Sequence, residues 1–157
     1  MPRIGELVTG VLVTLNETEN VEACINSMRL AGLESVILVD ACSTDDTVAK
    51  AIALGAECHV VSKKGIAFQR QIGVDLVRSP YVLLADADNR LEPDCISKLL
   101  RYLEASDFAG VAAQKVASAS HDYWSRAWEW NNTNALYTPG PKMVVGHPSL
   151  YKTAVLQ

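Results

Sequence analysis

Two carboxylates one residue apart, Asp86 and Asp88, directly follow the apolar run Tyr81–Ala85. Such groups repel each other, so holding them together costs free energy unless a cation neutralises the pair. Mg²⁺ and Mn²⁺ prefer oxygen ligands and keep coordination positions for water and substrate phosphates, so one or two protein carboxylates suffice. Asp-x-Asp also arises by chance, but its place after a buried-strand pattern favours a divalent metal site.

Two further polar clusters also follow apolar runs. Asn16 and Glu17 come after residues 11–15, and Asp40 ends the run 36–39. An acidic residue at such a strand end accepts hydrogen bonds from a ribose or a base in nucleotide-binding α/β folds, so Asp40 is predicted to contact a nucleotide. Asp45 lies directly at the next helix start, where capping or loop ordering is the favoured interpretation.

Cationic side chains gather around Gly65, where a third helix is predicted to begin. Lys63, Lys64 and Arg70, together with free backbone N–H groups at a helix start, suit a phosphate or an anionic base edge. The alternative is a solvated basic patch. For Arg70, ligand contact and a surface ion pair are equally favoured.

Short β-branched runs alternate with amphipathic stretches along the chain. Strands are predicted at 11–15, 36–39, 58–61 and 81–85, separated by helices that end near Gly32, Gly55 and Val77. A further helix starts at Pro93, and a strand spans Phe108–Val116. Doubly apolar strands that alternate with helices predict an α/β fold with a mostly parallel sheet, whose ligands gather at the carboxyl ends of its strands. The three polar clusters should therefore converge on one edge.

Length and charge limit the classes of function. A chain of 157 residues is one domain or part of one, and its net charge of −4 argues against a nucleic-acid partner. It has no apolar run long enough to span a bilayer and no secretory-signal pattern, so we expect a location in the cytoplasm or at the cytoplasmic face of a membrane. The four cysteines are isolated and predict neither a zinc site nor a disulfide framework.

These motifs resemble, in order, those of the family-2 glycosyltransferases, which have the GT-A fold. Val13–Glu17 looks like the first-strand motif, and Val39–Thr47 is close to Asp-x-x-Ser-Thr-Asp-Gly-Thr. Gly65–Gly73 is similar to Gly-x-Ala-x-Ala-Arg-Asn-x-Gly, with Gln71 in place of Asn, and Asp86–Asp88 matches Asp-x-Asp. The resemblance spans Val11 to about Leu103.

The resemblance implies a GT-A, Rossmann-like three-layer sandwich and a metal-dependent, inverting transferase. The donor would be a UDP- or GDP-linked sugar, the cofactor Mn²⁺ or Mg²⁺, and the acceptor hydroxyl that of a glycan or a lipid-linked molecule. Carried over by residue, Thr14 and Glu17 border the nucleoside, Asp40 reads the base, Arg70 lies near base or phosphate, Asp86 contacts ribose and metal-bound diphosphate, and Asp88 is the direct metal ligand.

Departures from the family pattern leave alternatives open. Val13 and Leu15 stand where Pro and Tyr are common, and the general base that an inverting transferase needs is not found. Asp122 and Glu129 lie in no matching context, so neither is nominated. We expect residues 1–112 to form the nucleotide-sugar-binding region and 113–157 to begin an acceptor-side region that is incomplete. A nucleotide-sugar-binding domain without catalysis is therefore an alternative.

Other interpretations are weaker. The aromatic stretch Tyr123–Trp130 predicts a core helix first, with an acceptor-stacking platform or an interfacial helix at a membrane surface as alternatives. A haloacid-dehalogenase-like phosphatase also uses Asp-x-Asp, but it would require Thr or Val where Arg90 stands. A dinucleotide oxidoreductase is disfavoured because no Gly-x-Gly-x-x-Gly follows the first strand.

Overall fold

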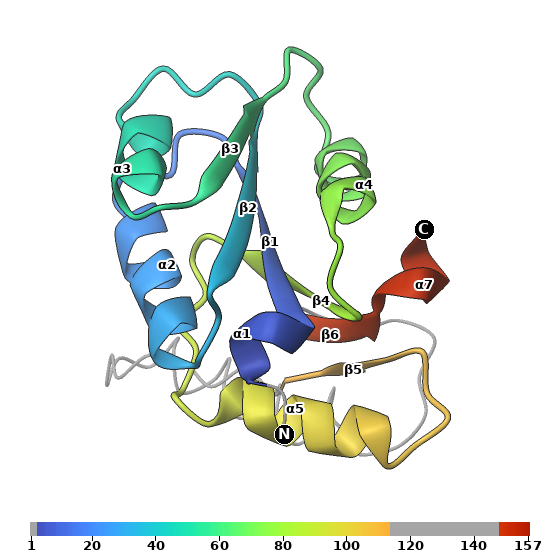
Figure 1. Ribbon diagram of the computed structural model, residues 1–157. Helices are drawn as coiled ribbons and strands as arrows, with labels where there is room; N and C mark the ends of the chain where they lie inside the picture. The colour runs from blue at the N-terminus through green and yellow to red at the C-terminus, as the bar shows by residue number, and fades with distance from the viewer. Residues whose placement is uncertain (1–2, 114–147) are drawn as a thin grey trace, which may run out of the picture.

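The computed structural model describes residues 3–113 and 148–157, and Figure 1 shows their arrangement. The strands are β1 (Val8–Thr14), β2 (Ser35–Asp40), β3 (Glu57–Val60), β4 (Tyr81–Asp86), β5 (Gly110–Ala112) and β6 (Ser149–Lys152). The helices are α1 (Ile4–Leu7), α2 (Val21–Leu30), α3 (Thr47–Ala53), α4 (Ile66–Leu76), α5 (Cys95–Glu104) and α7 (Thr153–Leu156). No helix among the described residues is long and apolar enough to cross a membrane.

The described strands form one sheet in the order β3-β2-β1-β4-β6-β5. β1 pairs in parallel with β2 and β4, and β2 pairs in parallel with β3, whereas β6 runs antiparallel to both β4 and β5. The register places Thr14 beside Asp40 and Val13 beside Asp86. The mostly parallel sheet is therefore confirmed, and the carboxyl ends of β1, β2 and β4 lie at one level.

Helices cover both faces of the sheet (Figure 1). On one face the apolar sides of α2, α3 and α5 pack against Val8, Leu12 and Leu38, which are buried. On the other face α4 and α7 lie over Val11, Ile37 and Val39. Alternate residues of β1 thus enter different cores, as a strand covered on both sides requires. The three-layer α/β sandwich is confirmed.

Helix α4 lies unusually close to the sheet. A Cβ atom added to Gly73 would come within 2.4 Å of Val11 Cγ1 and 3.4 Å of Val39 Cγ2. Only a residue without a side chain allows this approach. The close packing brings the amino-terminal end of α4 next to the ends of β1 and β2.

Two expectations need correction. Helix α5 begins at Cys95 with Asp94 as its N-cap residue, so Pro93 precedes the helix instead of starting it. The strand expected over Phe108–Val116 is shorter, because only Gly110–Ala112 is paired within the described residues. Residues 114–116 of that expected strand lie outside the described part of the chain.

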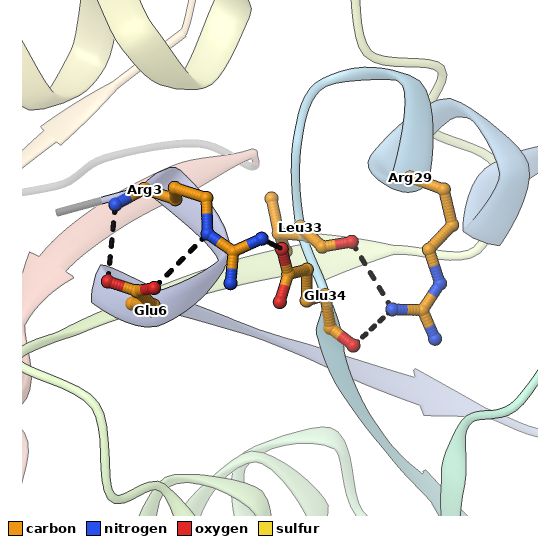
Figure 2. Close-up of polar contacts among 5 residues, drawn as sticks. All are labelled: Arg3, Glu6, Arg29, Leu33 and Glu34. Atoms are coloured by element: carbon orange, nitrogen blue, oxygen red, sulfur yellow. Dashed lines mark hydrogen bonds and ion pairs between the residues drawn. The ribbon is translucent and has the colours of Figure 1, made fainter.

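The opposite end of the sheet is held by two arginines (Figure 2). Arg29, in the last turn of α2, donates hydrogen bonds to the backbone oxygens of Leu33, at 3.2 Å, and of Glu34. Arg3 pairs with Glu6 at 3.1 Å and with Glu34 at 3.4 Å. A cationic side chain at a helix carboxyl end satisfies backbone carbonyls that lack helical partners. These contacts fix the turn that leads from α2 into β2.

Candidate functional site

The loops that follow β1 and β2 are tied together around Asp40. This side chain is fully buried, and its carboxylate accepts hydrogen bonds from Thr14 Oγ1 at 2.7 Å, Ser43 N at 2.6 Å and Ser43 Oγ at 2.6 Å. Buried polar groups need such partners, and three donors around one carboxylate satisfy it. The structure therefore gives Asp40 a role in ordering the strand ends, beneath the surface that a ligand would meet.

Asn16 and Asp45 join the same two loops on the outside. Asn16 has a φ of 57°, its N–H donates to Ser43 Oγ at 2.7 Å, and its side-chain oxygen accepts from Thr44 N at 2.9 Å. Asp45 accepts from Thr18 N at 3.1 Å and from Thr47 N at 3.0 Å. The hydrogen bond from Thr47 lowers the pKa of Asp45. Asp45 thus orders a loop beside the helix start, as expected, while Asp46 is the N-cap residue.

The turn after β4 holds Asp86 and Asp88 in place through Asn89. Asp86 N donates to Asn89 Oδ1 at 3.1 Å, and Asn89 Nδ2 donates to Asp88 Oδ1 at 2.9 Å. Asn89 is buried, whereas Asp88 is exposed. One amide therefore binds the backbone of the first acidic residue and the side chain of the second, which fixes the orientation of the Asp88 carboxylate.

Arg70 forms an ion pair at the end of β4. Its Nη2 atom lies 2.6 Å from Asp86 Oδ1, with 24% of the arginine side chain exposed. Arg70 therefore forms an ion pair with one of the two predicted metal-site residues. A contact with a ligand through its other nitrogens stays a prediction.

A second chain of contacts reaches Glu17. Arg90 donates to the backbone oxygen of Ala87 at 3.0 Å and to Asn20 Oδ1 at 3.3 Å. Asn20 Nδ2 in turn donates to Glu17 Oε2 at 3.0 Å. The turn after β4 is thus linked to the first turn of α2, and the Glu17 carboxylate is held at the same edge of the sheet.

These groups surround a cavity of about 580 Å³ at the carboxyl ends of β1 and β4. Its lining residues are Val13, Thr14, Leu15, Glu17, Asn20, Ala41, Lys64, Gly65, Ile66, Gln69, Asp86, Ala87 and Asp88. Of the predicted site residues, Thr14, Glu17, Asp86 and Asp88 line the cavity, whereas Asp40 and Arg70 lie behind it. The expected convergence of three polar clusters on one edge is confirmed. Asp40 is buried at that edge, where it binds Thr14 and Ser43.

The basic residues near Gly65 separate in the structure. Lys64 lines the cavity beside the amino-terminal end of α4, while Lys63 Nζ lies 4.7 Å from the centre of the Phe68 ring. First-turn N–H groups of a helix lack intrahelical partners and favour anions. Lys64 and this helix end together form the positive side of a cavity that also contains three carboxylates.

Sequence reasoning missed Gln69, Asn20 and Asn89. Gln69 stands at the second Ala of the motif Gly-x-Ala-x-Ala-Arg-Asn-x-Gly. This exchange of a small residue for a polar one could have drawn attention to Gln69. The two asparagines act through contacts with residues far along the chain or with backbone, and no spacing rule reveals such contacts. The aromatic stretch Tyr123–Trp130, and with it Asp122 and Glu129, lies outside the described residues.

A catalytic metal at this site would have few protein ligands. Within residues 3–113 and 148–157, no three His, Cys, Asp or Glu side chains are grouped so that they could hold a metal ion. Asp86 and Asp88 supply carboxylate oxygens at one cavity, which is the donor type that Mg²⁺ and Mn²⁺ prefer. The residues present fit an ion whose remaining ligands come from water and a bound phosphate.

The fold of the described residues is that of the GT-A glycosyltransferases. The model of the family described as glycosyl transferase family 2 matches residues 10–155, and the chain belongs to that family. An uncharacterized glycosyltransferase of Rickettsia conorii is 35% identical over 103 residues, which cover 66% of this chain and 36% of that protein. Glycosyltransferase AglJ of Haloferax volcanii is 35% identical over 91 residues, covering 55% and 29% of the two chains.

Solved structures show the same fold at low identity. S. aureus TarS in complex with UDP aligns with a TM-score of 0.70 at 15% identity, covering 96% of this chain and 48% of that one. Glucosyl-3-phosphoglycerate synthase from Mycobacterium tuberculosis, crystallised with Mn²⁺, UDP and glucosyl-3-phosphoglycerate, aligns with a TM-score of 0.65 at 19% identity, covering 96% and 58%. The GT-A fold is confirmed. The chain spans only about a third of the length of the first of these curated relatives.

Proposed function

We propose that this chain binds the nucleoside-diphosphate sugar donor of a glycosyl transfer reaction, together with Mg²⁺ or Mn²⁺. The observation that carries the proposal is one cavity that contains Asp86, Asp88, Lys64 and the amino-terminal end of α4. Carboxylates for a metal and cationic groups for a diphosphate are thus adjacent. Structures with this fold that contain UDP and Mn²⁺ support the choice of ligand.

Asp88 and Asp86 would hold the metal. Asp88 Oδ1 accepts from Asn89 and Asp86 Oδ1 from Arg70, so the second oxygen of each carboxylate has no partner within the described residues. Such a metal would stabilise the negative charge that develops on the departing nucleoside diphosphate. Lys64 and the first turn of α4 would bind the phosphates, and Glu17 would border the nucleoside.

Direct base reading by Asp40 stays a prediction, and the geometry makes it demanding. Asp40 is fully buried, so the loops that carry Thr14 and Ser43 would have to move before a nucleobase could reach the carboxylate. Thr14 is 3% exposed, so its contribution to a nucleoside contact is also limited. Asp40 and Thr14 would therefore hold the loops beside the cavity in place.

We propose further that the bound donor is used for sugar transfer. The family relationship favours sugar transfer with inversion to a glycan or lipid-linked hydroxyl, in the cytoplasm or at a membrane's cytoplasmic face. Residues 113–157 would begin the acceptor-side region, and we assign the cavity carboxylates Glu17, Asp86 and Asp88 to the donor and its metal, not to the general base. The second candidate, a domain that binds the donor without turnover, uses the same binding residues. Slow metal-dependent release of nucleoside diphosphate from a sugar nucleotide would favour the transferase.

Calorimetric titration tests the binding site. UDP and GDP, each with and without Mn²⁺, are titrated into the chain and into the Asp88→Ala variant. We expect metal-dependent binding that weakens at least about tenfold in the variant. Asp75→Asn is the matched control, because Asp75 is exposed on α4 and, among the described residues, its carboxylate accepts a hydrogen bond only from Gln71. Metal-independent binding, or unchanged binding by Asp88→Ala, would overturn the metal site.

A further inference from the structure

The side chain of Gln69 is anchored between two strand ends. Its Nε2 atom donates to Thr14 O at 3.1 Å and to Val39 O at 2.9 Å. The residue is only 4% exposed, yet it lines the cavity. Gln69 therefore reaches from the first turns of α4 to the junction of β1 and β2 and meets the cavity there.

The two partners fix which way the amide faces. Both are backbone carbonyl oxygens, which accept hydrogen bonds and cannot donate them. A flipped amide would place its own oxygen against them, so the nitrogen must point to the strands and both of its N–H bonds are used. The remaining polar atom, Oε1, has no hydrogen-bond partner within the described residues and is not among their fully buried polar atoms, so it is open to the cavity. Gln69 thus presents a fixed acceptor whose partner must come from solvent or a ligand in the cavity.

The position of this acceptor relative to the metal site indicates which part of a ligand it meets. The sheet order is β2-β1-β4, so the β1–β2 junction at Gln69 lies on the other side of β1 from the turn after β4. A diphosphate near Asp86 and Asp88 would leave its nucleoside to extend toward β1 and β2. The fixed oxygen therefore faces the base end of the ligand.

Neighbouring groups do not offer the same acceptor. Both oxygens of Asp40 are already used by Thr14 and Ser43, and that side chain is fully buried. Lys64 can only donate. A ligand that covers this oxygen without donating to it removes the water that would otherwise bind there, so a ligand that donates to it should bind about tenfold more tightly.

We infer that Gln69 Oε1 selects the nucleobase by accepting a hydrogen bond from a ring N–H, as presented by N3–H of uracil or N1–H of guanine. Cytosine presents a lone pair at the ring position N3, which would face the Gln69 oxygen unfavourably. Gln69 is thus a specificity-determining residue, and this assignment rests on the proposed nucleoside-diphosphate site.

The first test uses the unaltered chain with Mn²⁺. Competition titrations compare UDP with N3-methyl-UDP, which lacks the ring donor, and with 5-methyl-UDP, which carries a methyl group but keeps the donor. We expect N3-methyl-UDP and CDP to bind at least about tenfold more weakly than UDP, and 5-methyl-UDP to bind like UDP. If GDP is the preferred ligand, discrimination against N1-methyl-GDP supports the same contact with guanine.

The second test uses Gln69→Met, which keeps an unbranched side chain but removes the acceptor. The ratio of UDP to N3-methyl-UDP affinity should fall toward one in this variant. Gln71→Met is the matched control, because Gln71 is exposed on the same helix and its side chain, within the part of the chain that the structure describes, donates a hydrogen bond only to Asp75. Retention of the original ratio by Gln69→Met would overturn the inference.

The two proposals fail differently. If neither UDP nor GDP binds the unaltered chain, the nucleotide site itself is wrong. If UDP or GDP binds with metal but the N-methylated analogue binds as tightly, only the role of Gln69 is wrong. Should Gln69→Met fail to fold, because the amide also joins β1 to β2, the analogue series on the unaltered chain decides alone.

Discussion

Arg70 Nη2 donates a hydrogen bond to Asp86 Oδ1 at 2.6 Å, and this contact joins α4 to the end of β4. The pair is partly exposed, with 24% of the arginine and 36% of the aspartate side chain accessible. Arg70 Nε is buried and has no partner within the described residues. The chain thus supplies its own cation to one of the two adjacent carboxylates, which offsets part of the repulsion between Asp86 and Asp88.

Removal of this internal cation should strengthen metal binding. In Arg70→Met, both oxygens of Asp86 become available and one positive charge leaves the site. We expect Mn²⁺ without nucleotide to bind about tenfold more tightly than to the unaltered chain, with a difference that shrinks at high salt. Titration of Mn²⁺ followed by electron paramagnetic resonance measures this. Arg78→Met, which removes an exposed arginine beyond the other end of α4, is the control for net charge. Equal Mn²⁺ affinities of Arg70→Met and Arg78→Met would show that Arg70 does not compete with the metal for Asp86.

Asp40 should matter for stability more than for ligand contact. Asp40→Asn replaces one acceptor oxygen with an N–H₂ group that faces the donors of Thr14 and Ser43. We expect the free energy of unfolding to fall by about 2 kcal/mol. Urea denaturation measures it, with Asp75→Asn as an exposed control on α4. Unchanged stability together with lost nucleotide affinity would instead support direct base reading by Asp40.

The fold was predictable because its signals are local and repeated. Apolar strands alternated with amphipathic helices, and this pattern requires no knowledge of distant contacts. The placement of Asp86 and Asp88 followed from the rule that strand ends of a parallel sheet share an edge. The cavity lined by these residues and by Glu17 agrees with that reasoning.

The roles of Asp40 and Gln69 were not predictable in the same way. Whether a strand-end carboxylate faces a ligand or a loop depends on which donors the next loop supplies, and Ser43 reaches back by only three residues. The orientation of Gln69 depends on Thr14 and Val39, which lie 55 and 30 residues away. Such distant partners leave no periodic pattern in the sequence. Helix α5 also begins two residues later than predicted, at Cys95. Both Pro93 and Asp94 are residues that favour a helix start, and the N-cap position is taken by Asp94.

Close packing of α4 on the sheet should make Gly73 sensitive to substitution. The added methyl group of Gly73→Ala would lie 2.4 Å from Val11 Cγ1, so the helix or the strand must move. Alanine favours helices over glycine, but overpacking of about 1–3 kcal/mol should outweigh that gain. Thermal unfolding should show a lower midpoint, and the additional substitution Val11→Ala should recover part of it. A stabilised Gly73→Ala single variant would show that α4 is not held this closely.

Burial beneath the site should protect Cys24 from modification. Its Sγ atom lies 3.5 Å from Asp86 O, and burial raises its pKa from 9.0 to about 12. Because the pKa of the folded state is raised, the buried neutral thiol stabilises the fold below about pH 9, and this contribution is lost as the pH rises toward 12. At pH 8, iodoacetamide should therefore modify the exposed Cys42 and leave Cys24 intact until urea unfolds the chain. Mass spectrometry of the labelled peptides measures both sites. Equal labelling rates for Cys24 and Cys42 in the folded chain would contradict the buried position of Cys24 behind the Asp86 turn.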